Sequence, residues 1–360
     1  MRYAVNFNAD IMMYKMTFFG ILVAMLMLLL PTAAGAYDFE VDGIYYDLVD
    51  GHAVVTHNGQ YNCYSGDVMI PAAVTNEGTT YPVTVIGHSA FKNSTELITA
   101  VLPGSITAIE PRVFEGCTAL TSMVVPNTVT TMGANVFDKC YAIDSIVIGN
   151  KVTSLGDYMF NDCRALKKVV IGKSVTSIGK YAFNGCRSLT DVVIPNAVTT
   201  IGDWAFWNCS QLLSVTIGSG MTSLGRTVFD GCHQITNVTC LATTPPHVTY
   251  GGLFDDSGMY YHAKLHVLPE AVDAYEAAEI WKYFFQIIGD ATILVPEDVN
   301  CDGEVTVADV DNVIVIIING GSSGGHTRPD GKPINADVNG DGEVNIADIN
   351  CIIDMILRGN

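Results

Sequence analysis

The stretch LKKVVIGKSVTSIGKYAFNGC, residues 166–186, decides the fold of this chain because its pattern returns at a fixed interval. Within it, Leu166, Val169 and Ile171 alternate as in a short strand, and a second apolar pair precedes Phe183. The phenylalanine recurs every 23 residues, as Phe91, Phe114, Phe137, Phe160, Phe183, Phe206 and Phe229. A strict period of this length predicts a solenoid, in which each coil buries its apolar face against its neighbours.

The repeat also resembles a known family. Its pattern I-x-x-x-A-F-x-x-C-x-x-L-x-x-V-x-I-P is similar to the BspA-type leucine-rich repeat of bacterial surface proteins. The resemblance implies a mostly β solenoid over residues 86–240, with an amino-terminal cap at 37–85 and a carboxy-terminal cap at 241–295. It implies a strand followed by a helix in KLHVLPEAVDAYEAAEIWKYFFQIIG. The family's shared functional theme is adhesion or protein binding at the cell surface.

A cysteine column accompanies the phenylalanines. It follows each Phe by three residues, as Cys117, Cys140, Cys163, Cys186, Cys209 and Cys232, with Ser94 in the first copy. Neighbouring strands lie about 4.8 Å apart, so disulfides between coils are one alternative in an exported protein. Free cysteine is also among the most buried residue types. The regular place beside each Phe favours buried thiols.

Two surface rows are candidate binding sites. Aromatic residues recur two places before the Phe, as Tyr158, Tyr181 and Trp204, with Trp207 close by. Such a row anchors protein partners or stacks on sugar rings, and local stacking of ring on ring is the alternative. A second row at outward strand positions contains Val101, Val124, Val147, Val170, Val193, Thr216 and Thr239. An exposed apolar patch suggests a partner, whereas β-branched residues also simply suit strands.

The amino terminus is typical of a secretory signal peptide. Residues 18–30 are 13 uncharged apolar residues preceded by Lys15, and Ala34 and Ala36 then stand before Tyr37 in an A-x-A pattern. The run is shorter than the ~20 residues that a membrane span needs. We therefore expect cleavage of residues 1–36, no stable membrane span afterwards, and a secreted or cell-surface protein.

The acidic residues concentrate in the last segment, where two matching loops predict calcium sites. The chain has a net charge of −19, and residues 296–360 carry 12 acidic and three basic side chains. DVNCDGEVTVAD and DVNGDGEVNIAD each place oxygen donors at positions 1, 3, 5, 7, 9 and 12, with Gly at position 6. Hard oxygen donors favour Ca²⁺, here two ions, over a transition metal. The predicted ligands are Asp298, Asn300, Asp302, Glu304, Thr306 and Asp309, and Asp337, Asn339, Asp341, Glu343, Asn345 and Asp348.

This segment resembles the type I dockerin module. A helix pattern follows each loop, no amphipathic helix precedes either one, and position 12 is Asp rather than Glu. The resemblance implies a calcium-dependent fold whose helix face binds a cohesin domain, here through Val315, Ile316, Ile318, Met355 and Leu357. A module that only stabilises the carboxy terminus is the alternative, because Val307, Ala308, Ile346 and Ala347 stand where many dockerins carry recognition hydroxyls.

Composition and motifs exclude several functions. Only 18 Lys and Arg face 37 Asp and Glu, which argues against nucleic-acid binding. The sequence contains no nucleophile elbow, phosphate loop or H-E-x-x-H motif, so we assign no catalytic residue and expect no enzyme. The predicted function is non-enzymatic recognition of a protein or glycan. The alternatives are an accessory subunit of an extracellular polysaccharide-degrading assembly and, more remotely, a glycan-acting enzyme.

Overall fold

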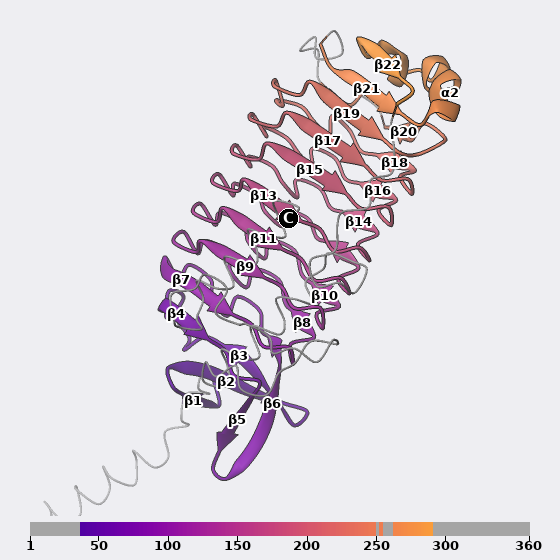
Figure 1. Ribbon diagram of the computed structural model, residues 1–360. Helices are drawn as coiled ribbons and strands as arrows, with labels where there is room; N and C mark the ends of the chain where they lie inside the picture. Colours follow the sequence, from indigo (N-terminus) through magenta and orange to yellow (C-terminus); the bar gives the residue numbers. More distant parts are fainter. Residues whose placement is uncertain (1–36, 250–251, 255–261, 291–360) are drawn as a thin grey trace, which may run out of the picture.

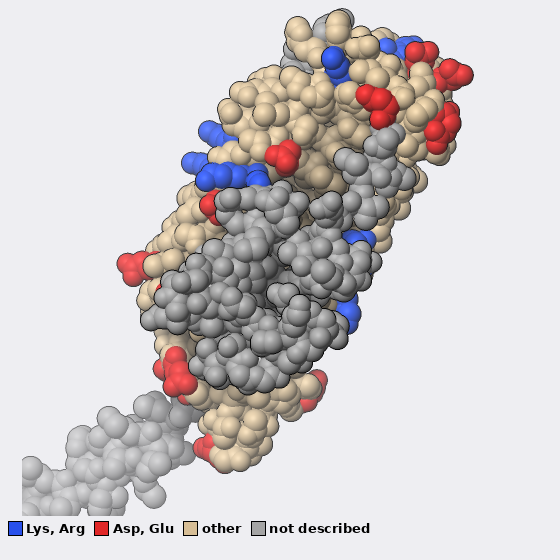
Figure 2. Space-filling model, viewed as in Figure 1, with Lys and Arg blue, Asp and Glu red and all other residues tan. Residues whose placement is uncertain are grey.

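Each 23-residue repeat forms one coil with two strands, and equivalent strands of successive coils pair in parallel. The computed structural model describes residues 37–249, 252–254 and 262–290. In one middle coil the first strand is β13 (Lys168–Val170) and the second is β14 (Ser177–Ile178). The register follows the repeat, since Ser177 pairs with Ser154 and with Thr200. The coils form an elongated stack (Figures 1 and 2).

The first strands of the coils build one side of the stack and the second strands build another (Figure 1). The first strands before β13 are β7 (Glu96–Val101), β9 (Ser122–Val124) and β11 (Ser145–Val147). Those after it are β15 (Asp191–Ile194), β17 (Ser214–Ile217), β19 (Asn237–Cys240), β21 (Lys264–Val267) and β22 (Gln286–Ile288), which pair in this order. The other second strands are β8 (Ala108–Ile109), β10 (Thr131–Met132), β12 (Ser154–Leu155), β16 (Thr200–Ile201), β18 (Ser223–Leu224) and β20 (His247–Val248). The predicted mostly β solenoid is confirmed.

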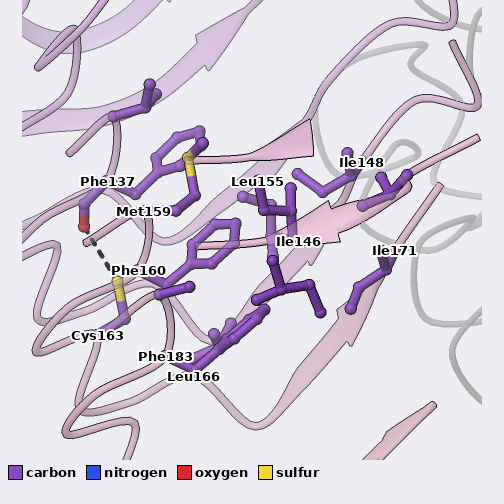
Figure 3. Close-up of a cluster of buried hydrophobic side chains, with 14 of the residues drawn as sticks. Phe137, Ile146, Ile148, Leu155, Met159, Phe160, Cys163, Leu166, Ile171 and Phe183 are labelled. Carbon is purple, nitrogen blue, oxygen red and sulfur yellow. Dashed lines mark hydrogen bonds between the residues drawn. The ribbon is translucent and has the colours of Figure 1, made fainter. Parts of the chain in front are cut away.

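The periodic phenylalanines form a continuous column through the core. All seven rings are buried, and consecutive centroids lie between 4.8 Å (Phe183 and Phe206) and 5.5 Å (Phe114 and Phe137) apart. Side chains from both strands of each coil close around this column, as Figure 3 shows for Leu155 and Leu166 around Phe160. The apolar face of a coil is therefore covered by the coils on either side.

The cysteine column consists of buried thiols. Each thiol donates a hydrogen bond to the backbone carbonyl of the Phe in the preceding coil, as from Cys163 Sγ to Phe137 O at 3.1 Å (Figure 3). All cysteines of the described residues are free. Burial raises the pKa of Cys117 to about 12, so that thiol stays protonated at neutral pH. The buried-thiol interpretation is confirmed within this part of the chain, and the disulfide alternative is wrong there.

A small β structure closes the amino-terminal end. β1 (Phe39–Val41), β2 (Ile44–Val49) and β3 (His52–Thr56) are antiparallel, and β3 pairs in parallel with β6 (Thr79–Ile86). β5 (Ala73–Asn76) pairs with β6, and β4 (Ser65–Met69) pairs with β7. The Tyr64 ring lies 4.4 Å from Phe91, so the cap covers the first ring of the core column.

The carboxy-terminal end is closed by a strand and short helices. β21 is followed by η2 (Pro269–Ala271), α2 (Val272–Ala277) and η3 (Trp281–Tyr283), where the resemblance implied a strand and a helix. Trp281 is buried and its Nε1 donates to Pro246 O at 2.9 Å. Tyr275 is also buried and donates to Ala242 O at 2.9 Å. No helix in the described ranges is long and apolar enough to cross a membrane.

Candidate recognition surface

The aromatic row lies on a corner where the backbone is left-handed. The residue two places before each Phe has a positive φ, with 55° at Tyr158, 54° at Tyr181 and 54° at Trp204. Ser89, Arg112, Asn135 and Thr227 share this conformation at the same place in other coils. Left-handed backbone costs a typical side chain about 1–2 kcal/mol and suits Gly and Asn best. Three successive bulky aromatic residues are therefore unfavourable choices for this turn.

A glycine two residues earlier lets the coils approach closely at this corner. A Cβ atom on Gly179 would lie 2.6 Å from the backbone nitrogen of Asp157 in the preceding coil, and one on Gly202 would lie 2.6 Å from that of Lys180. Real Cβ atoms do not tolerate such distances, so these positions require glycine. The short separation also brings the aromatic side chains of successive coils into contact.

The aromatic side chains stack face to face along the corner. The ring centroids of Tyr158 and Tyr181 lie 5.0 Å apart with planes 12° from parallel, and those of Tyr181 and Trp204 lie 5.2 Å apart at 13°. Trp207 meets Tyr181 edge-on at 6.2 Å. Tyr158 is 38% exposed and Trp207 is 36% exposed, whereas Tyr181 and Trp204 are half-buried. We call these four residues the aromatic strip, and within its stack the ring faces contact each other while edges remain accessible.

Charged residues of alternating sign flank the strip, one per coil. The backbone N–H of Lys180 donates to Asp157 Oδ1 at 2.7 Å, and that of Arg226 donates to Asp203 Oδ1 at 2.9 Å. Lys180 Nζ lies 3.1 Å from Asp203 Oδ2, and the Arg226 guanidinium lies 5.4 Å from the Trp204 ring centroid. The strip is thus bordered by charges that satisfy one another.

These contacts shift two pKa values in the expected directions. The backbone hydrogen bond from Arg226, followed by contact with Lys180, lowers the pKa of Asp203. The hydrogen bond to Asp203 raises the pKa of Lys180. Both groups therefore stay charged at neutral pH. This row was not predicted, although the charges alternate in sign at 23-residue intervals from Asp157 to Arg226 in the sequence.

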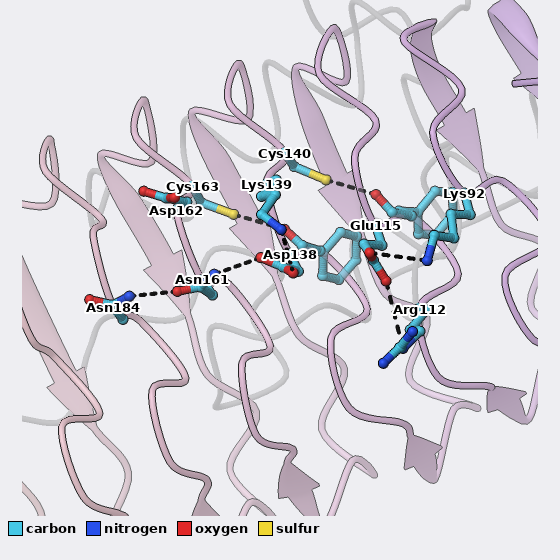
Figure 4. A network of polar contacts seen from close by, with 12 residues as sticks. Lys92, Arg112, Glu115, Asp138, Lys139, Cys140, Asn161, Asp162, Cys163 and Asn184 are labelled. Atoms are coloured by element: carbon cyan, nitrogen blue, oxygen red, sulfur yellow. Dashed lines mark hydrogen bonds and ion pairs between the residues drawn. The ribbon is translucent and has the colours of Figure 1, made fainter. Parts of the chain in front are cut away.

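A polar ladder runs beside the core one residue after each Phe (Figure 4). Asn184 Nδ2 donates to Asn161 Oδ1 at 2.6 Å, and Asn161 Nδ2 donates to Asp138 Oδ1 at 2.7 Å. In earlier coils Lys92 Nζ pairs with Glu115 Oε1 at 3.1 Å. These groups satisfy one another across coils. Trp207 takes the next place after Asn184, where the ladder of amides ends.

The outward valine row does not form a continuous exposed stripe. Val193 is 62% exposed, but Val101, Val124 and Val147 are buried, the last with no exposed surface. Val170, Thr216 and Thr239 are half-buried. Exposure therefore varies along the row even though the positions are equivalent in sequence. This row is not a single apolar docking surface, which corrects the uniform outward exposure expected from the strand alternation.

The predicted calcium ligands lie outside the described residues. This holds for both loops, from Asp298 to Asp309 and from Asp337 to Asp348, and for the helix-face residues Val315, Ile316, Ile318, Met355 and Leu357. It also holds for the signal segment 1–36. In the ranges that the structure does describe, no group of three or more His, Cys, Asp or Glu residues is placed to hold a metal ion. The two-ion calcium site stays a prediction from the sequence.

Comparison with family models identifies both parts of the chain. A model described as the BspA type leucine rich repeat region matches residues 76–167 and 153–250 in six copies. Residues 76–250 are a BspA-type leucine-rich repeat region. A second model, the dockerin type I domain, matches residues 296–357. Leucine-rich repeats together with a dockerin domain support a role in protein interactions at the cell surface or outside the cell.

Solved leucine-rich repeat proteins are similar to this chain at low identity. One from T. pallidum is 23% identical, with 60% of this chain and 88% of that one covered and a TM-score of 0.42. One from Bacteroides ovatus is 17% identical, with 71% and 92% covered and a TM-score of 0.32. A leucine-rich cell surface protein from Faecalibacterium prausnitzii is 18% identical, with 71% and 95% covered and a TM-score of 0.33. A search of curated proteins gave no match.

Proposed function

We propose that this protein is an exported, non-enzymatic recognition protein whose leucine-rich repeats bind a protein partner through the aromatic strip. The observation that carries the proposal is the placement of Tyr158, Tyr181 and Trp204 at left-handed backbone positions. The turn before each of the seven Phe residues is left-handed, so the strain itself belongs to the repeat. These three coils differ because they keep bulky aromatic residues at a place where the other coils have Ser, Arg, Asn or Thr. Tyr, Trp and Arg are also the residue types that dominate protein-binding hot spots.

The geometry of the strip favours a protein over a glycan. Sugar rings stack on open aromatic faces, but the faces of Tyr181 lie against Tyr158 and Trp204, at centroid distances of 5.0 and 5.2 Å. Arg226 lies over the Trp204 ring. The strip offers ring edges and mutually paired charges, which suit the mixed apolar and polar surface of a folded partner.

The tail is the second part of the proposal. We infer that residues 296–360 bind two Ca²⁺ ions, with ligands from Asp298 to Asp309 and from Asp337 to Asp348, and thereby either dock to a cohesin-like partner or stabilise the carboxy terminus. Its support is the dockerin match over residues 296–357 and the paired loops. Val315, Ile316, Ile318, Met355 and Leu357 are the proposed contact residues of its helices.

An accessory role in an extracellular polysaccharide-degrading assembly is the second candidate function, and the dockerin match favours it. In that case the tail attaches the protein through a cohesin and the repeats add a binding surface. The two candidates differ in what calcium controls. Chelation removes the whole protein from a cohesin-based assembly, whereas recognition by the strip survives chelation.

The strip is tested by replacing Tyr181 and Trp204 with Asn in the full chain. Asn suits left-handed backbone, so both variants should fold at least as readily while losing the aromatic edges. The wild-type chain first captures partners from envelope and secreted fractions, with Ca²⁺ and with EDTA. The affinity of each captured partner is then measured for the wild type and for each variant. We expect at least a tenfold loss of affinity, about 1.4 kcal/mol or more, for the partner that binds in EDTA.

Phe285→Asn is the control, because Phe285 is exposed and lies in the carboxy-terminal cap. Undiminished binding by Tyr181→Asn and Trp204→Asn would show that the strip serves only the stacking of the coils. Capture that depends entirely on Ca²⁺ would favour the assembly subunit instead.

A further inference from the structure

The charge of the repeats is segregated along the stack. Because a block of solenoid sequence is a slice of the molecule, sequence position reports position along the long axis. Residues 137–190 carry eight basic and four acidic side chains, a net charge of +4. Residues 37–136 carry two basic and ten acidic side chains. The described residues of 191–290 carry three basic and eight acidic side chains. The middle coils, which we call the basic belt, are positive between two negative ends, and Figure 2 shows blue side chains on both flanks of the middle.

Salt limits how far the acidic ends of the stack weaken the positive potential of the belt. At about 4.8 Å per coil, its 54 residues form a band roughly 11 Å wide. The Debye length at physiological ionic strength is about 8 Å, so the more distant acidic coils are largely screened from an ion at the centre of the belt. A short anionic group at these coils therefore meets a slice of net positive charge on a molecule that is acidic as a whole.

Arg187 is the group in the belt best placed to bind an anion. The residue after each column cysteine lies in a turn, and Arg164 and Arg187 occupy this place in successive coils, where both are exposed. Arg164 is partly neutralised, with Nε 3.3 Å from Asp162 Oδ1 and its guanidinium 4.6 Å from the Tyr141 ring centroid. Two residues before Arg187 the chain has Gly185 instead of an aspartate. Among the residues that the structure describes, Arg187 takes part in no ion pair.

Lys167, three residues after Arg164 and just before β13, carries a second weakly held charge. Its Nζ lies 3.8 Å from Asp144 Oδ2, and both side chains are largely exposed. Exposed ion pairs of this length contribute little to stability, so a carboxylate of a partner can replace that of Asp144. The planar guanidinium of Arg187 matches a carboxylate through two parallel hydrogen bonds.

We propose that the exposed turns of the basic belt that carry Arg164 and Arg187 bind a short acidic segment of a protein partner. The width of the belt sets the length, since roughly 11 Å accommodates three or four residues of extended peptide. A long uniform polyanion would extend onto the acidic coils on either side. This contact is separate from the aromatic strip and does not depend on it.

The experiment measures binding of a fluorescent tetraglutamate peptide to the full chain by anisotropy, at about 50 and 300 mM NaCl with Ca²⁺ present. We expect binding at low salt that weakens at least tenfold at the higher salt, because the contact is electrostatic. Arg187→Glu combined with Lys167→Glu should weaken it a further fivefold or more. Lys264→Glu combined with Lys282→Glu makes the same charge change at two exposed positions of the carboxy-terminal cap, outside the belt, and should have at most a twofold effect.

Three results would overturn the proposal. The first is absence of tetraglutamate binding at low salt. The second is an equal loss in the Lys264→Glu and Lys282→Glu double variant and in the belt variant, which would show a general charge effect. The third is stronger binding of oligogalacturonate than of tetraglutamate, which would assign the belt to a carboxylated glycan.

Discussion

Asp138 is a carboxylate placed among buried groups, and its surroundings only partly compensate the charge. It is 6% exposed and accepts a hydrogen bond from Asn161 Nδ2 at 2.7 Å, with Lys139 Nζ 3.6 Å from its other oxygen (Figure 4). Burial, together with the nearby Glu115, raises the pKa of Asp138 despite these contacts. A raised pKa means that the stability this group contributes is present at low pH and is lost as pH rises through the folded-state value.

Replacing Asp138 with Asn should therefore stabilise the protein at pH 7. The amide keeps an acceptor for Asn161, extends the ladder of Asn161 and Asn184, and removes the buried charge. We expect a gain of about 1 kcal/mol at pH 7 in urea unfolding. The gain should disappear below the ordinary aspartate pKa, where the wild-type group is protonated.

Asp191→Asn is the matched control, because Asp191 is exposed on β15, and it should change stability by less than about 0.5 kcal/mol. A loss of stability in Asp138→Asn at pH 7 would mean that the pair with Lys139 outweighs the burial of the charge.

At the scale of the element, the unit that matters is the turn between the second strand of a coil and its Phe. Gly179 directly follows β14 and brings the backbone of one coil against Asp157 of the coil before. The next residues carry the alternating charges and the aromatic strip. Glycine here serves close approach, so its substitution should change coil spacing and the stack of rings together.

Gly179→Ala should destabilise the protein by about 1–3 kcal/mol, as an overpacked site does. The added Cβ would lie 2.6 Å from the backbone nitrogen of Asp157, which cannot move without shifting the preceding coil. Urea unfolding monitored by Trp fluorescence measures both stability and any change in the environment of Trp204. A destabilisation below about 0.5 kcal/mol would show that the coils separate easily.

Gly104→Ala provides the control on the same chain. A Cβ on Gly104 meets no atom within 4 Å, so this variant should be neutral or stabilised by up to about 1 kcal/mol through the unfolded state. Equal losses at positions 104 and 179 would point to a general effect of losing glycine rather than to close packing.

At the scale of the whole molecule, the chain joins two parts whose stability has different sources. The repeats are stabilised by contacts between neighbouring coils and by caps at both ends. The tail is predicted to depend on Ca²⁺, because three carboxylates in each loop repel one another without a cation.

We therefore expect two thermal transitions in the full chain, only one of which depends on Ca²⁺. At a free Ca²⁺ concentration about 100 times the Kd, each ion should add roughly 2.7 kcal/mol to the part that binds it. Calorimetry in Ca²⁺ and in EDTA measures both transitions. The Asp298→Ala and Asp337→Ala double variant should behave in Ca²⁺ as the wild type does in EDTA. A single transition that moves as a whole with Ca²⁺ would contradict the separation.

The sequence by itself determined the solenoid, the Phe column and the buried place of the cysteines. With a 23-residue period of apolar residues, every coil can bury its apolar face only against the next coil. The residues that repeat in sequence are therefore the same residues that contact each other between coils. The sequence also predicted which aromatic residues share a row. The prediction of the calcium loops rests on residue spacing alone, and the positions of their ligands remain predictions.

Only the tertiary structure decided what the surface rows are. Strand alternation assigns Val147 and Val193 to equivalent outward places, yet one is buried and the other is 62% exposed. The left-handed backbone of Tyr181 and the contact of Arg226 with Trp204 likewise depend on how closely coils approach. A repeat pattern specifies contacts that every coil makes, whereas exposure, charge pairing and ring stacking depend on which particular side chains become neighbours.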